Sequence, residues 1–91
     1  MTAQQIAELR QRLGLSQVQL AQLLGVHSLT VSKWERGLLA PTEHQTTLLA
    51  SFGKAGKANK AIGEEVASLL VAVGVVAALF VLLEAALGKK K

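Results

Sequence analysis

The sequence predicts an all-α fold: a four-helix bundle at residues 1–52, a basic linker at 53–63, a long hydrophobic helix at 64–88 and a basic tail at 89–91. Two observations indicate this. Before the hydrophobic segment, β-branched residues are sparse and form no alternating run, whereas apolar residues recur at helical spacing. Residues 66–83 then carry no charge at all.

The net charge of +4 is modest and unevenly placed. Three lysines give the 53–63 segment most of the excess, so the predicted bundle is close to neutral. This balance permits a polyanionic partner but does not identify one.

The residues that other chemistries need are absent or scattered. The chain has no cysteine, which excludes disulfides and thiolate zinc sites. His27 and His44 have no neighbouring Cys, Asp or His, so no metal and no other cofactor is expected. Ser28 and Ser32 lack an adjacent His–Asp arrangement, so an enzyme is the least expected class. The polar N-terminus is unlike a signal peptide, and we expect a cytoplasmic, DNA-associated chain.

The first two helices are marked by apolar spacing and by caps. The first carries apolar residues at i, i+3 and i+7, which are Ile6, Leu9 and Leu13. Gly14 follows, the residue type expected just past a helix end. Ser16 is a good N-cap for the second helix, and Gln19 completes a capping box. Gly25 ends this helix.

The third helix is expected at residues 28–36, only three residues after the second. Two short helices joined by so tight a turn cross steeply, as in a helix-turn-helix. Val31 and Trp34 point to one side and are expected in the core. The other side has no acidic residue and mostly short side chains, which suits a helix that presses into a groove; it carries Ser28, Leu29, Ser32, Lys33 and Arg36. We therefore expect this helix to enter the major groove of double-stranded DNA.

The fourth helix begins at the N-cap Thr42, with Gln45 in the capping-box position, and has an apolar face that ends at Phe52. The segment 53–63 that follows contains three glycines, with lysines at every third position: Lys54, Lys57 and Lys60. It reads as a solvated spacer or as a fraying extension of the helix. A basic strap that touches phosphates of DNA or lipid is the alternative.

The run LRQRLGLSQVQLAQLLGVHSLTVSKWERG, residues 9–37, resembles the Cro/repressor type of helix-turn-helix domain, the xenobiotic-response-element family. The resemblance continues through Pro41 into the fourth helix and covers about half of the chain. It implies a compact helical bundle that binds operator DNA, usually as a dimer.

The resemblance also implies roles for individual residues. Gln17 matches a residue that binds a DNA phosphate and braces the third helix. Arg36 matches a position near the phosphate backbone of the DNA. The positions implied to read or flank base edges are His27, Ser28, Leu29, Ser32 and Lys33. Arg10 and Glu35 match an ion pair between the first and third helices. Leu29 departs from the polar residue that family members often carry, and suits a thymine methyl group.

Residues 64–87 predict a single helix about 36 Å long. Its uncharged centre, residues 66–83, reaches the length of a transmembrane candidate. A seam of small residues suits helix association and includes Ala67, Val71, Gly74, Ala78 and Val81. A second seam is large and apolar: Leu69, Val73, Val76, Phe80, Leu83 and Leu87.

This helix has no polar face, so it must lie in lipid or be enclosed by protein. An anchor at the inner face of the cell membrane and a soluble oligomer core both remain open. The function expected is therefore a transcriptional regulator that binds specific duplex DNA as a dimer or larger homo-oligomer. The alternative is an architectural protein that tethers DNA through its C-terminal helix.

Overall fold

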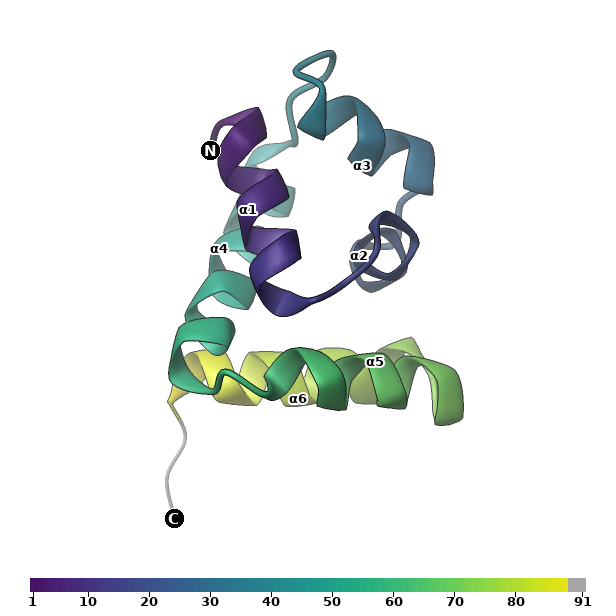
Figure 1. Cartoon of the computed structure of the whole chain (residues 1–91), viewed down its shortest axis with the longest axis vertical. Coiled ribbons are helices and arrows are strands. Elements are labelled where there is room, and N and C mark those ends of the chain that lie inside the picture. The colour runs from purple at the N-terminus through teal and green to yellow at the C-terminus, as the bar shows by residue number, and fades with distance from the viewer. Residues whose placement is uncertain (89–91) are drawn as a thin grey trace.

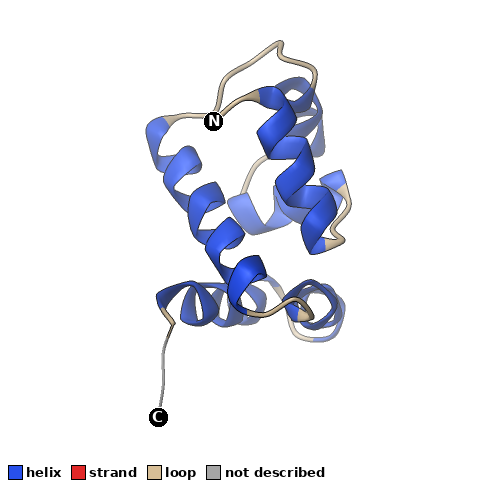
Figure 2. Cartoon of the chain, turned by 60° about the vertical axis from the view of Figure 1, so that its left-hand side comes forward, coloured by secondary structure: helices blue, strands red, loops and turns tan. Residues whose placement is uncertain are grey.

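In a computed structural model that describes residues 1–88, the chain forms six helices and no strand (Figures 1 and 2). The all-α prediction is confirmed for this part of the chain. The helices are α1 (Ala3–Leu13), α2 (Gln17–Leu24), α3 (Ser28–Glu35), α4 (Glu43–Ala58), α5 (Ile62–Ala72) and α6 (Val75–Leu87). The basic tail predicted at 89–91 lies outside the described residues.

Three of the helices begin with a capping box, in which a hydroxyl and a glutamine side chain each bind the backbone N–H of the other residue. The pairs are Thr2–Gln5 at α1, Ser16–Gln19 at α2 and Thr42–Gln45 at α4. The sequence predicts the boxes at α2 and α4, and that at α1 is additional. Gly25 ends α2 with a φ of 69°, a left-handed conformation that glycine adopts without strain. The turn between α2 and α3 thus forms where the sequence places it.

One core joins all six helices. Trp34 and Val31 of α3 are fully buried in it, as predicted. Leu49 and Phe52 of α4 belong to the same core. In Figure 1, α4 runs down to a hairpin formed by α5 and α6. The hairpin adds its own buried residues to the same cluster, namely Ile62, Val66, Ala78 and Leu82.

Helix α4 continues six residues past the predicted boundary at residue 52. Residues 53–58 are therefore not a spacer; they form the helix extension that the sequence left open. This extension packs closely on α1, since a Cβ at Gly56 would lie only 2.9 Å from Cδ2 of Leu13. Glycine lets α4 approach α1, and Ala55 is fully buried beside it.

The prediction of one long helix over residues 64–88 is wrong. The chain turns back at Gly74, which separates α5 from α6 and produces two antiparallel helices (Figure 1). Gly74 has φ 134° and ψ 179°, a conformation that essentially only glycine adopts. The turn lets both halves of the apolar segment pack against each other, and α6 also packs against α4. Within residues 1–88, no helix has the length and apolar character needed to cross a membrane.

The turn also divides the predicted association seam between two helices. Ala78 is fully buried inside the chain's own core, and Val71 lies near the C-terminal end of α5 and is largely exposed. Ala67, Gly74 and Val81 are partly buried. These five residues therefore do not form one continuous face, since the seam assumed an unbroken helix.

The hairpin is held to the first helix by a backbone contact. Ile62 and Gly63, at the start of α5, are buried, and Gly63 lies directly against Leu13 at the end of α1. A Cβ added to Gly63 would overlap the carbonyl oxygen of Leu13. Because that obstacle is backbone, it cannot rotate aside as a side chain does.

We expect Gly63→Ala to lower the free energy of unfolding by about 3 kcal/mol or more, since the added methyl group must push α5 off α1. Alanine otherwise favours a helix by about 0.5–1 kcal/mol, so a loss reports the clash. Urea unfolding followed by circular dichroism measures it. The matched control is Gly53→Ala, whose Cβ would meet the movable Cδ1 of Leu9 at 3.1 Å. Equal stability changes in the two variants would contradict the contact.

Candidate nucleic-acid interface

Helix α3 has a buried side and an outward side. The six predicted contact positions on or directly beside α3 lie outside the core: His27, Leu29, Lys33 and Arg36 are exposed, and Ser28 and Ser32 are partly exposed. Glu35 is the one acidic residue of α3, and its side chain is only 9% exposed. The outward side is consequently cationic, with Lys33 and Arg36 on it and the single carboxylate of the helix turned inward.

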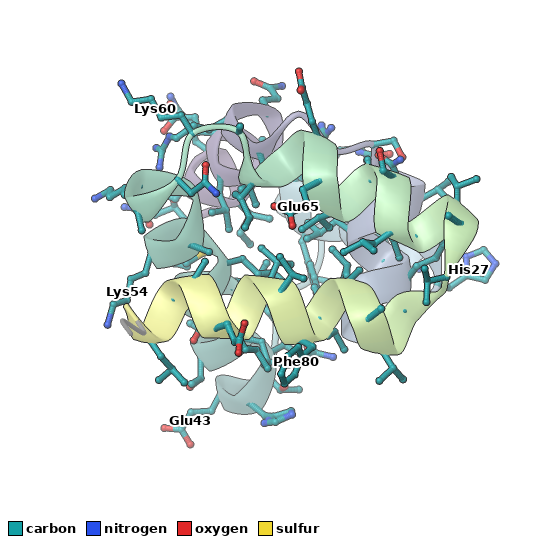
Figure 3. The ribbon with its side chains drawn as sticks, turned by 90° about the horizontal axis from the view of Figure 1, so that it is seen from below. His27, Glu43, Lys54, Lys60, Glu65 and Phe80 are labelled. Atoms are coloured by element: carbon teal, nitrogen blue, oxygen red, sulfur yellow. The ribbon has the colours of Figure 1, made fainter. Side chains whose placement is uncertain are left out.

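His27 caps the start of α3. Its Nδ1 accepts a hydrogen bond from the backbone N–H of Leu29 at 3.1 Å. An accepting Nδ1 carries no proton, so the proton of the neutral ring is on Nε2. Figure 3 shows the ring directed away from the rest of the molecule. The sequence predicts either a helix cap or a base-reading residue at this position. In the structure the ring caps the helix, and Nε2–H remains as a donor at its outer edge.

Arg36 folds back along the helix it follows. Its Nε donates to the carbonyl oxygen of Ser32 at 3.3 Å and to the Oγ of Ser32 at 3.2 Å. The Ser32 hydroxyl accepts in this contact and retains its own proton as a donor. The two predicted site residues therefore lie together at the C-terminal end of α3.

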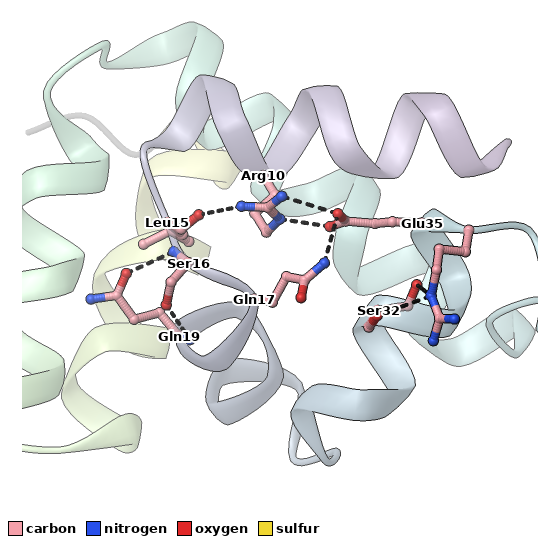
Figure 4. Close-up of polar contacts among 8 residues, drawn as sticks. Arg10, Leu15, Ser16, Gln17, Gln19, Ser32 and Glu35 are labelled. Carbon is pink, nitrogen blue, oxygen red and sulfur yellow. Dashed lines mark hydrogen bonds and ion pairs between the residues drawn. The ribbon is translucent and has the colours of Figure 1, made fainter.

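The inward carboxylate of Glu35 meets two donors (Figure 4). Arg10 of α1 binds it through two parallel contacts, Nε to Oε2 at 2.6 Å and Nη2 to Oε1 at 3.0 Å. Gln17 of α2 donates from Nε2 to Oε1 at 3.1 Å. The remaining guanidinium nitrogen of Arg10 donates to the carbonyl oxygen of Leu15 at 2.9 Å. The network connects α1, α2 and α3, and so fixes α3 relative to the turn that carries it.

The network changes the acidity of both charged groups. Burial alone would raise the pKa of Glu35, but the hydrogen bonds from Arg10 and Gln17 and the charge of Arg10 outweigh it, and the pKa lies below its ordinary value. The hydrogen bond to Glu35 raises the pKa of Arg10. Both side chains are mostly shielded from water, at 15% and 9% exposure for Arg10 and Glu35.

The start of α2 offers donors beside this network. The Oγ of Ser16 accepts a hydrogen bond from the backbone N–H of Gln19. The other N–H groups in the first turn of a helix have no partner within the helix, so they can donate to another molecule. The side-chain amide of Gln17 uses one N–H for Glu35 and has a second. Such a helix start, with its positive dipole end, suits a phosphate group.

One member of the site has no signature in the sequence. The carbonyl oxygen of Leu15 fixes the third nitrogen of Arg10, yet every residue carries a carbonyl group. Only the three-dimensional path of the loop between α1 and α2 brings it within reach.

Comparison with known proteins gives one match. The sequence model of the family described as Helix-turn-helix matches residues 6–52, just over half of the chain. Neither the curated proteins nor the solved structures gave a match to the chain. The matched region covers most of α1, all of α2 and α3, and most of α4, and thus every residue of the interface described above.

We expect the stabilising effect of Glu35 to depend on pH. Folding lowers the pKa of this group, so its charged form stabilises the fold above the ordinary pKa of 4.5. That contribution is lost as the pH falls through the lowered pKa. At neutral pH, Glu35→Gln should lower the free energy of unfolding by about 1–3 kcal/mol. Below pH 4.5 the difference from the unmodified chain should shrink.

Urea unfolding at a series of pH values measures this difference. Glu8→Gln, at an exposed position of α1, serves as the control and should give a much smaller effect at every pH. A Glu35→Gln effect that stays constant from pH 7 to pH 3 would show that the ion pair is not its source.

Proposed function

The chain belongs to the Cro/repressor-type helix-turn-helix family of DNA-binding proteins, and from this premise we propose that it binds specific double-stranded DNA sites and regulates transcription as a dimer or larger assembly. Residues 1–52 bind the duplex, and α3 enters the major groove. Binding at a promoter then blocks or recruits the transcription machinery.

The observation that supports this proposal most is the charge arrangement of α3. Its outward side carries Lys33 and Arg36, and its one carboxylate is bound by Arg10 and Gln17. A free acid at that place would repel the phosphate backbone. The ion pair therefore removes the one local obstacle to a polyanion and orients the helix at the same time.

Base recognition in this proposal uses the N-terminal half and centre of α3. Lys33 can donate to guanine O6 and N7, and the hydroxyl of Ser28 can donate or accept at a base edge. His27 presents Nε2–H, and Leu29, an exposed apolar side chain, suits the methyl group of thymine. The hydroxyl of Ser32 adds a further donor. This set favours a site that contains both a guanine and a thymine.

Phosphate contacts in this proposal flank the reading residues. Gln17 and the free N–H groups at the start of α2 bind one phosphate, and Arg36 binds another. Such contacts set the register of the protein on the duplex but carry no base information. Gln17 is bonded to Glu35, so a phosphate held there is coupled to the position of α3.

We expect substitutions on the two kinds of position to act differently. Lys33→Ala and Ser28→Ala should weaken binding to the preferred site by about 1–3 kcal/mol each, with little effect on unrelated DNA, because they remove base contacts. Gln17→Ala should weaken binding to all sequences by a similar factor, because it removes a phosphate contact.

The preferred site is obtained first by selecting bound fragments from random duplex DNA with the full chain. Fluorescence anisotropy then gives the affinity of each variant for that site and for scrambled DNA. Ser68→Ala on α5 is the matched control for Ser28→Ala and should change neither value. If none of the three interface variants loses affinity, α3 is not the groove-binding helix.

A further inference from the structure

Helix α6 has one buried side and one exposed side, and both are apolar. Ala78 and Leu82 face the core and are fully buried. On the opposite side, residues spaced four, three and four apart lie in a row along the helix; this outer stripe consists of Val76, Phe80, Leu83 and Leu87. Their exposed fractions are 82%, 63%, 36% and 77%. Figure 3 shows Phe80 on the side of α6 that faces away from α5.

The partner helix of the hairpin is built differently. From residue 62 to residue 70 of α5, the exposed positions are Glu64, Glu65 and Ser68, which are polar; only near its end does α5 expose a large apolar side chain, that of Val71. The one charged residue of α6 is Glu84, at the edge of the outer stripe. The first part of α5 thus presents polar groups to water, whereas the exposed side of α6 stays apolar from Val76 to Leu87, apart from Glu84 at its edge. This contrast indicates that the outer stripe is covered by another molecule.

We propose that the outer stripe binds the outer stripe of a second copy of this chain, with the two α6 helices antiparallel across a twofold axis. In a twofold contact the same surface faces itself, so it must be self-complementary. A row without charge, and with one large side chain near its centre, meets this condition. A charged partner would find no group of opposite sign within the stripe.

The area of the stripe fits this occupant. The exposed fractions leave about 400 Å² of apolar surface in the stripe of each chain, the size of the largest patch on an ordinary monomer. Two copies, with the residues that flank each stripe, would remove on the order of 1,000 Å² from water, which is near the lower limit for a specific interface. We therefore expect a dimer that dissociates on dilution.

The dimer leaves the nucleic-acid interface free. Helix α3 lies at the opposite end of the molecule from the hairpin in Figure 1, and no residue of the stripe belongs to it. The inference specifies the surface for the self-association included in the proposed function. The test of self-association needs no DNA, so the dimer proposal can fail while the DNA-binding proposal holds, and the DNA-binding proposal can fail while the dimer proposal holds.

The first test is sedimentation equilibrium of the full chain without DNA over a range of concentrations. We expect a monomer–dimer equilibrium, and we expect Phe80→Glu to raise its dissociation constant at least 100-fold. Circular dichroism establishes that this variant is folded. The matched control is Leu38→Glu in the loop before α4, where the leucine is 64% exposed, and it should leave the equilibrium unchanged.

A second test does not depend on a disruptive substitution. The chain has no cysteine, so a single new thiol reports its own surroundings. With a short bis-maleimide, Leu83→Cys, near the middle of the stripe, should form a covalent dimer at concentrations where Leu38→Cys does not.

A chain that stays monomeric at every concentration, or equal cross-linking of the two cysteine variants, overturns the proposal. The other candidate occupant of an apolar stripe is a lipid surface, and vesicles of anionic phospholipid test for it. If the monomeric chain binds them and Phe80→Glu abolishes that binding, the stripe faces lipid and the second-copy proposal is wrong.

Discussion

The carboxylate of Glu35 joins three helices at one point. Arg10 approaches it from α1 with a pair of parallel hydrogen bonds, and Gln17 approaches it from α2. The geometry of two planar forks restricts both distance and orientation, which a single point charge does not. Because the carboxylate is on α3, the direction in which this helix faces solvent depends on the contact. The same contact hides the negative charge of α3, so positioning and electrostatics have one origin.

The N-terminal half of the fold could be predicted because its signals are local. Capping boxes such as Ser16–Gln19 operate within four residues, and Gly25 marks the turn through its own backbone conformation. Trp34 could be assigned to the core from helical spacing alone. The pairing of Arg10 with Glu35 was implied only by the family resemblance, since the residues are far apart in the chain.

The C-terminal half could not be predicted in the same way because a glycine in the sequence is compatible with a flexible linker, with close helix packing and with a turn. Gly53, Gly56 and Gly63 read as a flexible linker in composition, yet each lies where a neighbouring helix comes too close for a Cβ to fit freely. Gly74 lies inside an apolar run that is as compatible with one long helix as with a hairpin. The choice depends on the surface that α4 provides, which is a property of the tertiary structure and of no single segment.

The burial of Gly63 against Leu13 has a consequence for how this protein can be divided. The boundary of the family match at residue 52 suggests a portable unit, but Leu49 and Phe52 share their core with Ile62 and with the hairpin. A fragment cut at that boundary would uncover those side chains to water. The proposed DNA-binding helices and the hairpin thus depend on one shared core, so we expect that moving the interface to another scaffold would require moving the hairpin with it.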